Sequence, residues 1–295
     1  MANLFCFGLG YTARCYIARY GDRLDHVAGT VRDRDQTRDR IGATDVEVLA
    51  FNGTAPAPAV PALLSAADLL LVSVPPEEEG DPVLRFFAEA IARADRVATI
   101  VYLSTIGVYG DYGGAWIDET AQPLPLTARS RARLDAELAW RALAERCGKA
   151  LAILRLAGIY GPGRNALRQV ADSTARRVAK PGQVFNRIHV SDIAQAVAAA
   201  FDRRANGIFN VADDEPSPSG DPIIFAAGLL GRAPPPELPF EEAARTMSPL
   251  ALSFYGETKR VRNDRLKRDL GVALHYPTYR EGLRALAAAG EGAAP

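Results

Sequence analysis

The stretch Phe5–Ala13, FCFGLGYTA, decides how the rest of the chain is interpreted. A short apolar run ends in a glycine, and a Gly-x-Gly-x-x-Ala spacing follows at once. In this spacing Gly8 allows a tight turn, Gly10 lets the backbone approach a pyrophosphate, and Ala13 keeps a helix close to the strand. Unpaired N–H groups at the N-terminus of that helix favour an anion. The stretch therefore predicts a phosphate-binding junction between a first strand and a first helix, with a junction that holds no ligand as the alternative.

The rest of the chain alternates between apolar runs and helical patterns. Almost uniformly apolar runs, such as DLLLVSV, are typical of strands that are covered on both faces. Strands are expected at residues 4–7, 26–31, 46–51, 68–74, 97–103, 151–156 and 207–211, and helices at 12–20, 82–94, 127–147 and 193–201. This alternation predicts an α/β fold, a Rossmann-type doubly wound parallel sheet with right-handed crossovers.

The chain is expected to divide into two domains. Residues 1–157, with about 186–213, should form the dinucleotide-binding domain. Residues 158–185 and 214–286 are richer in Gly and Pro, and are expected to form a smaller, loop-rich substrate domain that includes helices near 223–230 and 241–245. The tail at 287–295 is small and polar, and we expect it to be frayed.

Composition excludes several classes of protein. Of the 295 residues, 35 are Lys or Arg and 35 are Asp or Glu, so the balanced charge argues against a nucleic-acid binder or a polybasic membrane anchor. We find no apolar run of bilayer length and no secretory signal in the opening residues. Cys6, Cys15 and Cys147 have no metal-binding spacing and indicate reduced thiols, a cytoplasmic location and no metal site.

Arg32 and Asp33 follow the second expected strand, at the place that sets cofactor preference. An acid about 20 residues after the glycines binds the ribose hydroxyls of NAD, whereas an arginine accommodates the 2′-phosphate of NADP. The planar guanidinium of Arg32 comes first in the chain and favours NADP. Asp33 follows directly, so NAD remains a possible cofactor. In a further alternative, Arg32 is exposed on the surface and binds no cofactor.

Further residues are expected beside the cofactor. Tyr11 and Thr12 stand next to the glycines at the head of the first helix, and Ser73, Val74 and Pro75 close the fourth strand. Ligands in such sheets lie beyond the carboxyl ends of the strands. These residues are therefore expected to line the cofactor site, with a simple strand-ending turn as the alternative for residues 73–75.

Four later segments carry a resemblance to a known family, the extended short-chain dehydrogenase/reductases of the epimerase/dehydratase group. The segments are YLSTIGVYG (102–110), LRLAGIYGPGR (154–164), RIHVSDIAQAV (187–197) and FNVADDEP (209–216). Together with the glycine turn they run in the family's order over roughly residues 3–285. The segments SPLALSFYGETKRV and LHYPTYREGL resemble a bacterial subgroup of epimerase-like proteins. The resemblance implies a small-molecule substrate, and a homodimer through the long helix is the family's habit.

The resemblance also places the catalytic helix, RSRARLDAE, residues 129–137. In the family this helix carries Tyr-x-x-x-Lys, with a glutamate four residues beyond the lysine. Glu137 fits the glutamate place, which puts Arg133 at the lysine place and Arg129 at the tyrosine place. The two arginines share one helix face and are expected to face the cleft, while Arg131 points elsewhere. Because the pKa of arginine lies above about 12, Arg129 is a poor acid or base, so the chain resembles an atypical member that lacks the usual proton-transfer pair.

Other catalytic candidates come from the same resemblance. Ser104 and Thr105 keep the place of a Ser/Thr that hydrogen-bonds a reacting oxygen, so they are expected, with Arg129, to stabilise an oxyanion. Tyr109 is the best remaining phenol near the site, although its usual role is to line it. Tyr160 is a weaker candidate that we place beside the cofactor, and Tyr112 is weaker too.

Three further side chains are candidates for binding substrate. Arg164 and Arg187 are expected to hold an anionic group at the domain junction, with surface ion pairs as the alternative. His189 titrates near neutrality, but a satisfied structural histidine is the alternative that we favour. Asp192 is expected to cap the helix that follows it. Asp118 and Glu119 resemble the family's acidic loop element, with a solvated loop as the alternative.

Two functions remain open. The first is an NAD(P)-dependent oxidoreductase or epimerase-like enzyme that acts on a small, anionic substrate with a non-standard active site. The second is a non-catalytic NAD(P)-binding sensor that changes its contacts with a protein partner, as the missing Tyr–Lys pair suggests. We favour the enzyme because a loop-rich domain over the cleft is a substrate-binding arrangement, although the fold alone does not decide function.

Overall fold

The strand β1 (Ala2–Phe7) lies at the centre of a seven-stranded sheet in which every neighbouring pair is parallel. The computed structural model describes residues 1–32 and 40–293. The sheet order is β13-β9-β7-β6-β1-β2-β5, so the chain moves outward from β1 in one direction and then, from β6 on, in the other. This confirms the Rossmann-type fold, and the switch point lies between β1 and β6, where ligands of such sheets bind.

The bounds of the elements agree with the expected ones to within a few residues along the sheet. Its other strands are β2 (Leu24–Val31), β5 (Glu47–Ala50), β6 (Leu69–Val72), β7 (Thr99–Thr105), β9 (Ala150–Leu156) and β13 (Gly207–Val211). The helices that cover it are α1 (Tyr11–Tyr20), α2 (Val60–Ala66), α3 (Pro82–Arg93), α4 (Ala128–Cys147), α6 (Val190–Asp202) and α10 (Asp264–Leu270). Helices α2 and α10 were not expected, because each has only seven residues and lies in a stretch whose sequence is equally typical of a loop.

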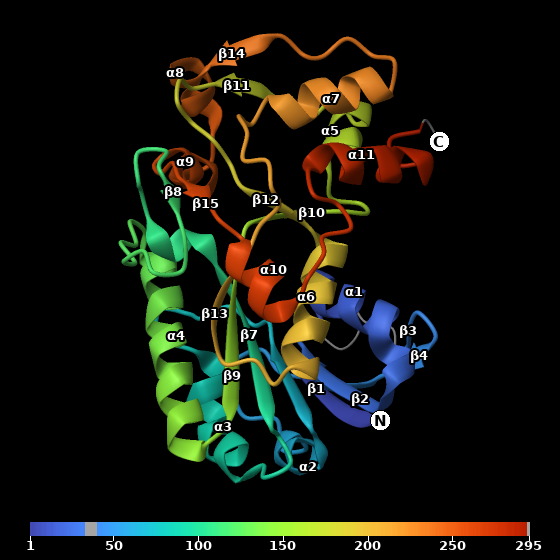
Figure 1. Cartoon of the computed structure of the whole chain (residues 1–295), viewed down its shortest axis with the longest axis vertical. Coiled ribbons are helices and arrows are strands. Elements are labelled where there is room, and N and C mark those ends of the chain that lie inside the picture. Colours follow the sequence, from blue (N-terminus) through green and yellow to red (C-terminus); the bar gives the residue numbers. More distant parts are fainter. Residues whose placement is uncertain (33–39, 294–295) are drawn as a thin grey trace.

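Two apolar cores hold the helices on opposite faces of the sheet (Figure 1). On one face Cys6 and Leu71 pack with α1, α6 and α10. On the other face Phe7 and Tyr102 pack with α2, α3 and α4. Strand residues of alternating orientation therefore serve both cores, which explains why the central strands are apolar without interruption.

The smaller lobe lies beyond the carboxyl ends of the strands (Figure 1). Its elements are β8 (Trp116–Ile117), β10 (Gly158–Tyr160), α5 (Ala166–Ala171), β11 (Arg177–Ala179), β12 (Arg187–His189), α7 (Asp221–Leu229), β14 (Glu237–Pro239), α8 (Phe240–Ala243), α9 (Pro249–Tyr255), β15 (Arg260–Val261) and α11 (Tyr279–Ala288). A core around Leu167, Ile223 and Leu283 joins α5, α7 and α11. Short elements also connect remote parts of the chain, since β15 pairs with β8 and β12 with β10. The remaining short elements are η1 (Gly21–Arg23), β3 (Arg40–Ile41), β4 (Thr44–Asp45), η3 (Ile106–Tyr109) and η4 (Ala244–Thr246).

Two parts of the C-terminal region differ from expectation. Residues 264–272 return to the large sheet, where Leu266 and Leu270 enter the core beside α6 and β13. The tail expected to be frayed is packed as far as it is described. Ala287 and Ala288 end α11, and the Glu291 carboxylate accepts hydrogen bonds from Gly163 N (2.8 Å) and Asn165 Nδ2 (3.1 Å).

Helix α6 begins in a different way from the one expected. His189, not Asp192, is the N-cap, and its Nδ1 accepts a hydrogen bond from Ser191 N (3.1 Å). Asp192 lies in the first turn and is fully buried, where it accepts bonds from the backbone N–H groups of His275 (2.6 Å) and Tyr276 (3.2 Å). The carboxylate thus ties the segment before α11 to the large domain.

A buried ion pair joins α4 to the sheet. Glu137 of α4 and Arg155 of β9 meet at 2.6 Å, and each side chain is only 2% exposed. Ser104 at the end of β7 donates to the same carboxylate at 2.5 Å, and Arg155 lies over the ring of Tyr109 at 4.6 Å. Three secondary-structure elements are therefore fixed to one another through a single carboxylate.

None of the helices within the described residues combines the length and the apolar composition needed to cross a membrane.

Replacement of Arg155 by methionine is expected to lower the free energy of unfolding by roughly 3–5 kcal/mol, because the Glu137 charge is then left buried without its partner. The matched control is Arg146→Met, which removes an exposed ion pair with Glu89 (3.3 Å) and should cost less than about 1 kcal/mol. Urea denaturation followed by circular dichroism measures both. Equal effects of the two substitutions would contradict this role of the pair.

Candidate functional site

The glycine turn after β1 is built for close packing against the switch point. Gly8 has φ +90°, and a Cβ there would lie 2.7 Å from Ser73 Oγ. Its N–H donates to Thr30 Oγ1 (3.0 Å), and its carbonyl accepts from Ser73 Oγ (2.6 Å). Gly10, the N-cap of α1, is different, because a Cβ there would meet nothing within 4 Å. Its backbone therefore faces open space at the helix N-terminus.

A cavity of about 290 Å³ lies beside this turn, over the ends of β1, β2 and β6. The sequence-predicted cofactor residues that line it are Gly8, Gly10, Arg32, Ser73, Val74 and Pro75. Asn52, Gly53 and Glu77 complete its wall. Arg32 is exposed at the rim, which suits a long side chain that reaches a ligand from solvent. Asp33 lies outside the described residues.

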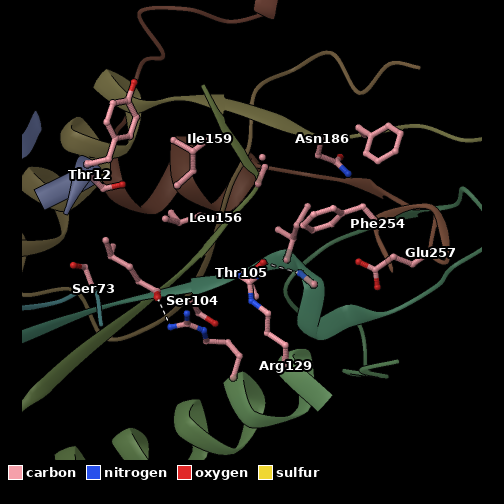
Figure 2. A pocket seen from close by; sticks show the side chains of 18 of the residues that line it. Thr12, Ser73, Ser104, Thr105, Arg129, Leu156, Ile159, Asn186, Phe254 and Glu257 are labelled. Carbon is pink, nitrogen blue, oxygen red and sulfur yellow. Dashed lines mark hydrogen bonds between the residues drawn. The ribbon is translucent and has the colours of Figure 1, made fainter. Parts of the chain in front are cut away.

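A second cavity of about 380 Å³ adjoins the first and shares Gly10 and Ser73 with it (Figure 2). The sequence-predicted residues that line it are Gly10, Tyr11, Thr12, Ser73, Ser104, Thr105, Arg129, Arg133 and Arg164. Tyr11 spans its upper wall, where its hydroxyl donates to Pro162 O at 3.0 Å. Burial raises the pKa of Tyr11 to about 12, so this phenol stays protonated. The two cavities are neighbours at the switch point, because Gly10 and Ser73 line both of them.

The two arginines of α4 do face this cavity, as the helix spacing predicted. Arg133 Nη1 donates to Tyr102 Oη (3.1 Å) and to Leu103 O (3.0 Å), which fixes its guanidinium against β7. Arg129 is exposed one turn earlier and extends from α4 toward Thr105 (Figure 2). Arg133 is thus anchored, while Arg129 offers its charge to the cavity.

The hydroxyl groups near the arginines have less freedom than expected. Ser104 is buried, and its proton is already donated to Glu137, so only its lone pairs face the cavity. Thr105 caps a short 3₁₀ turn, η3 (Ile106–Tyr109), by accepting from Gly107 N at 3.1 Å. Ser104 is therefore not free to donate to a developing oxyanion, whereas Thr105 accepts its bond and keeps its own proton available.

Tyr109 does not line either cavity, contrary to its expected place at the site. It is fully buried, and its hydroxyl donates to Asn210 Oδ1 at 2.7 Å. Burial also raises its pKa. The 3₁₀ turn directs this ring away from the cavity and into the space between η3 and β13.

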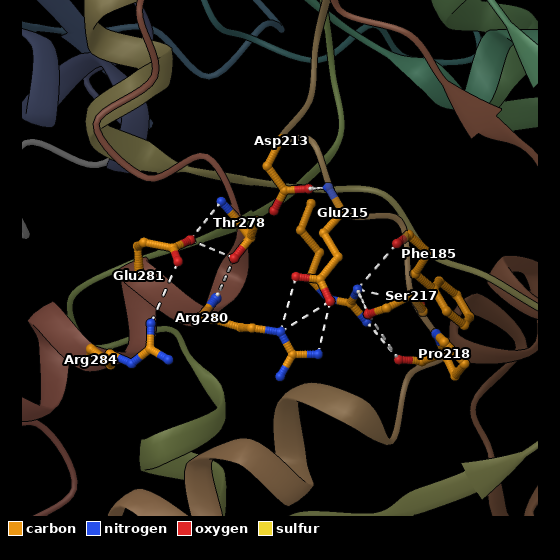
Figure 3. A network of polar contacts seen from close by, with 10 residues as sticks. Phe185, Asp213, Glu215, Ser217, Pro218, Thr278, Arg280, Glu281 and Arg284 are labelled. Atoms are coloured by element: carbon orange, nitrogen blue, oxygen red, sulfur yellow. Dashed lines mark hydrogen bonds and ion pairs between the residues drawn. The ribbon is translucent and has the colours of Figure 1, made fainter.

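Tyr160, Arg187 and His189 were also expected at the site, but they lie outside both cavities. Tyr160 belongs to the core of the small lobe, and burial raises its pKa. Arg187 donates to Phe185 O (3.1 Å), Ser217 Oγ (2.9 Å) and Pro218 O (3.2 Å), and Figure 3 labels these three partners. A guanidinium that is already bound in this way is not available to a substrate.

His189 is also structural. Its side chain is buried between the rings of Tyr160 and Tyr276, and it caps α6. Burial lowers its pKa to about 4, so the imidazole is neutral near pH 7. Of the expected substrate-binding residues, only Arg164 lines the cavity.

The cavity also contains residues that the sequence did not indicate as functional. Glu257 and Lys259 lie at its outer end, beside Phe254 and Asn186. They belong to the segment SPLALSFYGETKRV, whose resemblance to a subgroup was visible but whose chemistry was not. The pairing of β15 with β8 carries them across the fold to the loop after η3. Within residues 1–32 and 40–293, no group of three His, Cys, Asp or Glu side chains gathers that could hold a metal ion.

Comparisons with known proteins agree with this geometry. A conserved protein of unknown function from Silicibacter pomeroyi is 45% identical, with a TM-score of 0.88, over 99% of this chain and 100% of that one. A 3-diazoavenalumate denitrifying reductase from a Streptomyces species is 32% identical over 138 residues, which is 44% of this chain and 45% of the reductase. The chain thus matches less than half of that reductase's length.

The remaining comparisons concern the fold and the family. A dTDP-glucose 4,6-dehydratase from Bacillus anthracis, whose structure is in complex with NAD, shares the fold with a TM-score of 0.76 at 12% identity, over 96% of this chain and 94% of that one. The sequence pattern of the NAD-dependent epimerase/dehydratase family matches residues 86–212. Together with the Rossmann-type sheet and the cleft at its switch point, this match identifies a domain of the NAD-dependent epimerase/dehydratase family within the chain.

Proposed function

We propose that the protein is an NADP-linked oxidoreductase that reduces or oxidises a small anionic substrate in the cleft across the switch point. The observation that carries the proposal is that two neighbouring cavities share Gly10, beside the N-terminus of α1 and two arginines. The 3-diazoavenalumate denitrifying reductase is a relative whose name denotes reduction, which supports this class of reaction.

The cleft fits a dinucleotide. The open space at Gly10 leaves room for a pyrophosphate beside the N–H groups of α1, where the helix dipole favours negative charge. Arg164 lies on the same side of the cleft. It is close enough to Tyr11, in the first turn of α1, for its charge to lower the pKa of that phenol. Arg32 at the far end favours a 2′-phosphate, hence NADP, with NAD as the alternative through Asp33. A bound nicotinamide would supply or accept hydride.

The substrate end of the cleft is cationic. Arg129, Arg133 and Lys259 line it, against the single carboxylate of Glu257 among its described lining residues. Apolar walls are provided by Ile159 and Phe254. A small substrate with an anionic group and an apolar body matches this lining, because the guanidinium of Arg129 is positioned to form a charge-assisted bond with it.

A non-catalytic sensor is the second candidate. It is favoured by one observation, namely that Ser104 donates its proton to Glu137 while arginines stand at the expected Tyr and Lys places. A sensor would bind the dinucleotide without turnover and would change its association with a partner. Analytical ultracentrifugation with and without NADP, alongside NADPH turnover over a carbonyl library, separates the two functions.

Replacement of Gly10 by alanine should weaken the binding of NADP at least about tenfold while leaving the melting temperature unchanged, because the added methyl group meets no protein atom but occupies the space of the pyrophosphate. Gly228→Ala in α7 is the matched control, since a Cβ there also meets nothing within 4 Å. Calorimetric titration measures binding. Unchanged binding by the Gly10 variant would place the dinucleotide elsewhere.

Replacement of Arg32 by alanine should raise the Kd for NADP roughly tenfold or more, the effect of losing a hydrogen bond to a charged group, and leave the Kd for NAD within about twofold. Arg23→Ala, in the exposed turn after α1, serves as the control. The same titrations with both dinucleotides provide the measurement. An equal loss for NAD and NADP would show that Arg32 does not read the 2′-phosphate.

Replacement of Arg129 by alanine should raise KM for a carboxylate-bearing carbonyl substrate by about tenfold or more, and change KM for its neutral amide analogue by less than about twofold. Arg131→Ala, two residues along the same helix and exposed, is the control. Steady-state oxidation of NADPH measures both. If the neutral analogue loses as much as the anion, then Arg129 does not bind the charge.

A further inference from the structure

Glu257 and Lys259 form an ion pair at the outer end of the larger cavity. Lys259 Nζ lies 3.0 Å from Glu257 Oε1, and their side chains are 4% and 16% exposed. Both residues line the cavity, and Figure 2 shows Glu257 beside Phe254 on the side opposite Ser73. An ion pair as buried as this one is costly, because both charges are removed from water. Its position in the reaction cleft therefore needs a reason other than stability.

The segment that carries the pair is held firmly on both sides. Lys259 Nζ also donates to Gly110 O at 2.7 Å. The carbonyl of Glu257 accepts from Gln183 Nε2 (2.7 Å), and the carbonyl of Lys259 accepts from Asn186 Nδ2 (2.9 Å). With the backbone and the ammonium both fixed, Oε1 of Glu257 is held on Lys259, and Oε2 has no hydrogen-bond or ion-pair partner among the described residues.

The other polar side chains of the cleft are poor proton donors. Arg129 and Arg133 keep their protons, because guanidinium has a pKa above about 12. Ser104 has given its proton to Glu137, and Tyr109 is buried elsewhere. Tyr11 donates to Pro162 O. Glu257, with a raised pKa, and Lys259, with a lowered pKa, are the groups of this cavity whose shifts favour proton exchange.

The surroundings of Glu257 favour such an exchange. Burial raises the pKa of Glu257, and Asp111 on the loop after η3 raises it further, while Lys259 lowers it. Burial lowers the pKa of Lys259, whose ammonium is held by Glu257 and by Gly110 O. Arg129 and Arg133 line the same cavity from α4.

We propose that Glu257 is the general acid/base of this protein and that Lys259 is its positioning residue, in place of a phenol and lysine on α4. The inference rests on the proposed oxidoreductase function. In the direction of reduction, hydride from the reduced nicotinamide dinucleotide adds to the carbonyl carbon, and the C=O π pair becomes a lone pair on oxygen. Glu257 donates a proton to that oxygen, which completes the hydroxyl group, and the carboxylate regains a proton from water at the cavity mouth.

The first test compares Glu257→Gln with wild type and with Glu241→Gln, an exposed glutamate on α8 of the same lobe. Loss of a general acid should lower kcat by about 100-fold or more and abolish the fall of kcat at high pH, with the NADPH Kd within about twofold of wild type. The control should keep the wild-type rate and pH profile. A Glu257 variant with kcat within threefold and an unchanged pH profile would overturn the proposal.

The second test examines Lys259 as a positioning residue. Lys259→Met removes the positive charge that lowers the pKa of Glu257, so the high-pH limb of kcat should move to higher pH, while Lys259→Arg should restore its position. Thermal melting shows whether each variant is folded. A pH limb that stays in place in a folded Lys259→Met variant would show that the pair is merely structural and would overturn this part of the proposal.

A third readout needs no turnover and separates the two levels of inference. An infrared difference spectrum of the NADPH complex, wild type minus Glu257→Gln, should show the C=O band of a protonated carboxyl that disappears with rising pH. Its absence at every pH overturns the role of Glu257, whatever the rates. The band together with NADPH binding, but with no turnover across the carbonyl library, would support the titrating carboxyl and refute the proposed oxidoreductase.

Discussion

The structure depends first on one buried carboxylate. Glu137 neutralises Arg155 and accepts the proton of Ser104, so that α4, β9 and β7 can meet only in one register. Because a helix repeats every 3.6 residues, fixing Glu137 also fixes the direction of Arg133 and Arg129, one and two turns earlier. The ion pair therefore orients the cationic face of the cleft although neither of its members lines the cleft. Glu137 also accepts the proton of the Ser104 hydroxyl, which is then not free to bond a ligand.

Charge is distributed along the cleft in a definite order. Arg32 stands at one end, the open helix N-terminus at Gly10 in the middle, and the arginines of α4 near the other end. Each location matches one anionic part of an extended ligand, since a dinucleotide phosphate and an acidic substrate both require positive potential. Glu257, at the outer end, carries a negative charge instead. Because this carboxylate is paired with Lys259, it does not cancel the positive potential deeper in the cleft.

Much of this was predictable from the sequence, and the failures have physical causes. Continuous apolar runs located the central strands, and the glycine spacing located the cleft, because both are local patterns. The direction of a hydrogen bond is not local. The segment YLSTIGVYG placed Ser104 and Tyr109 near the site, but their partners, Glu137 and Asn210, come from α4 and β13. Glu257 escaped notice because β15 reaches the cleft only by pairing with β8, some hundred and forty residues earlier in the chain.

The contact between Glu291 and the loop at 161–165 has a practical consequence. That carboxylate holds the amide of Gly163, and the same loop offers Pro162 O to Tyr11 and carries Arg164. Glu291 thus supports the loop that forms this side of the cleft. A substitution or deletion that removes the Glu291 carboxylate would disturb the cleft more than its distance from the glycine turn in sequence suggests.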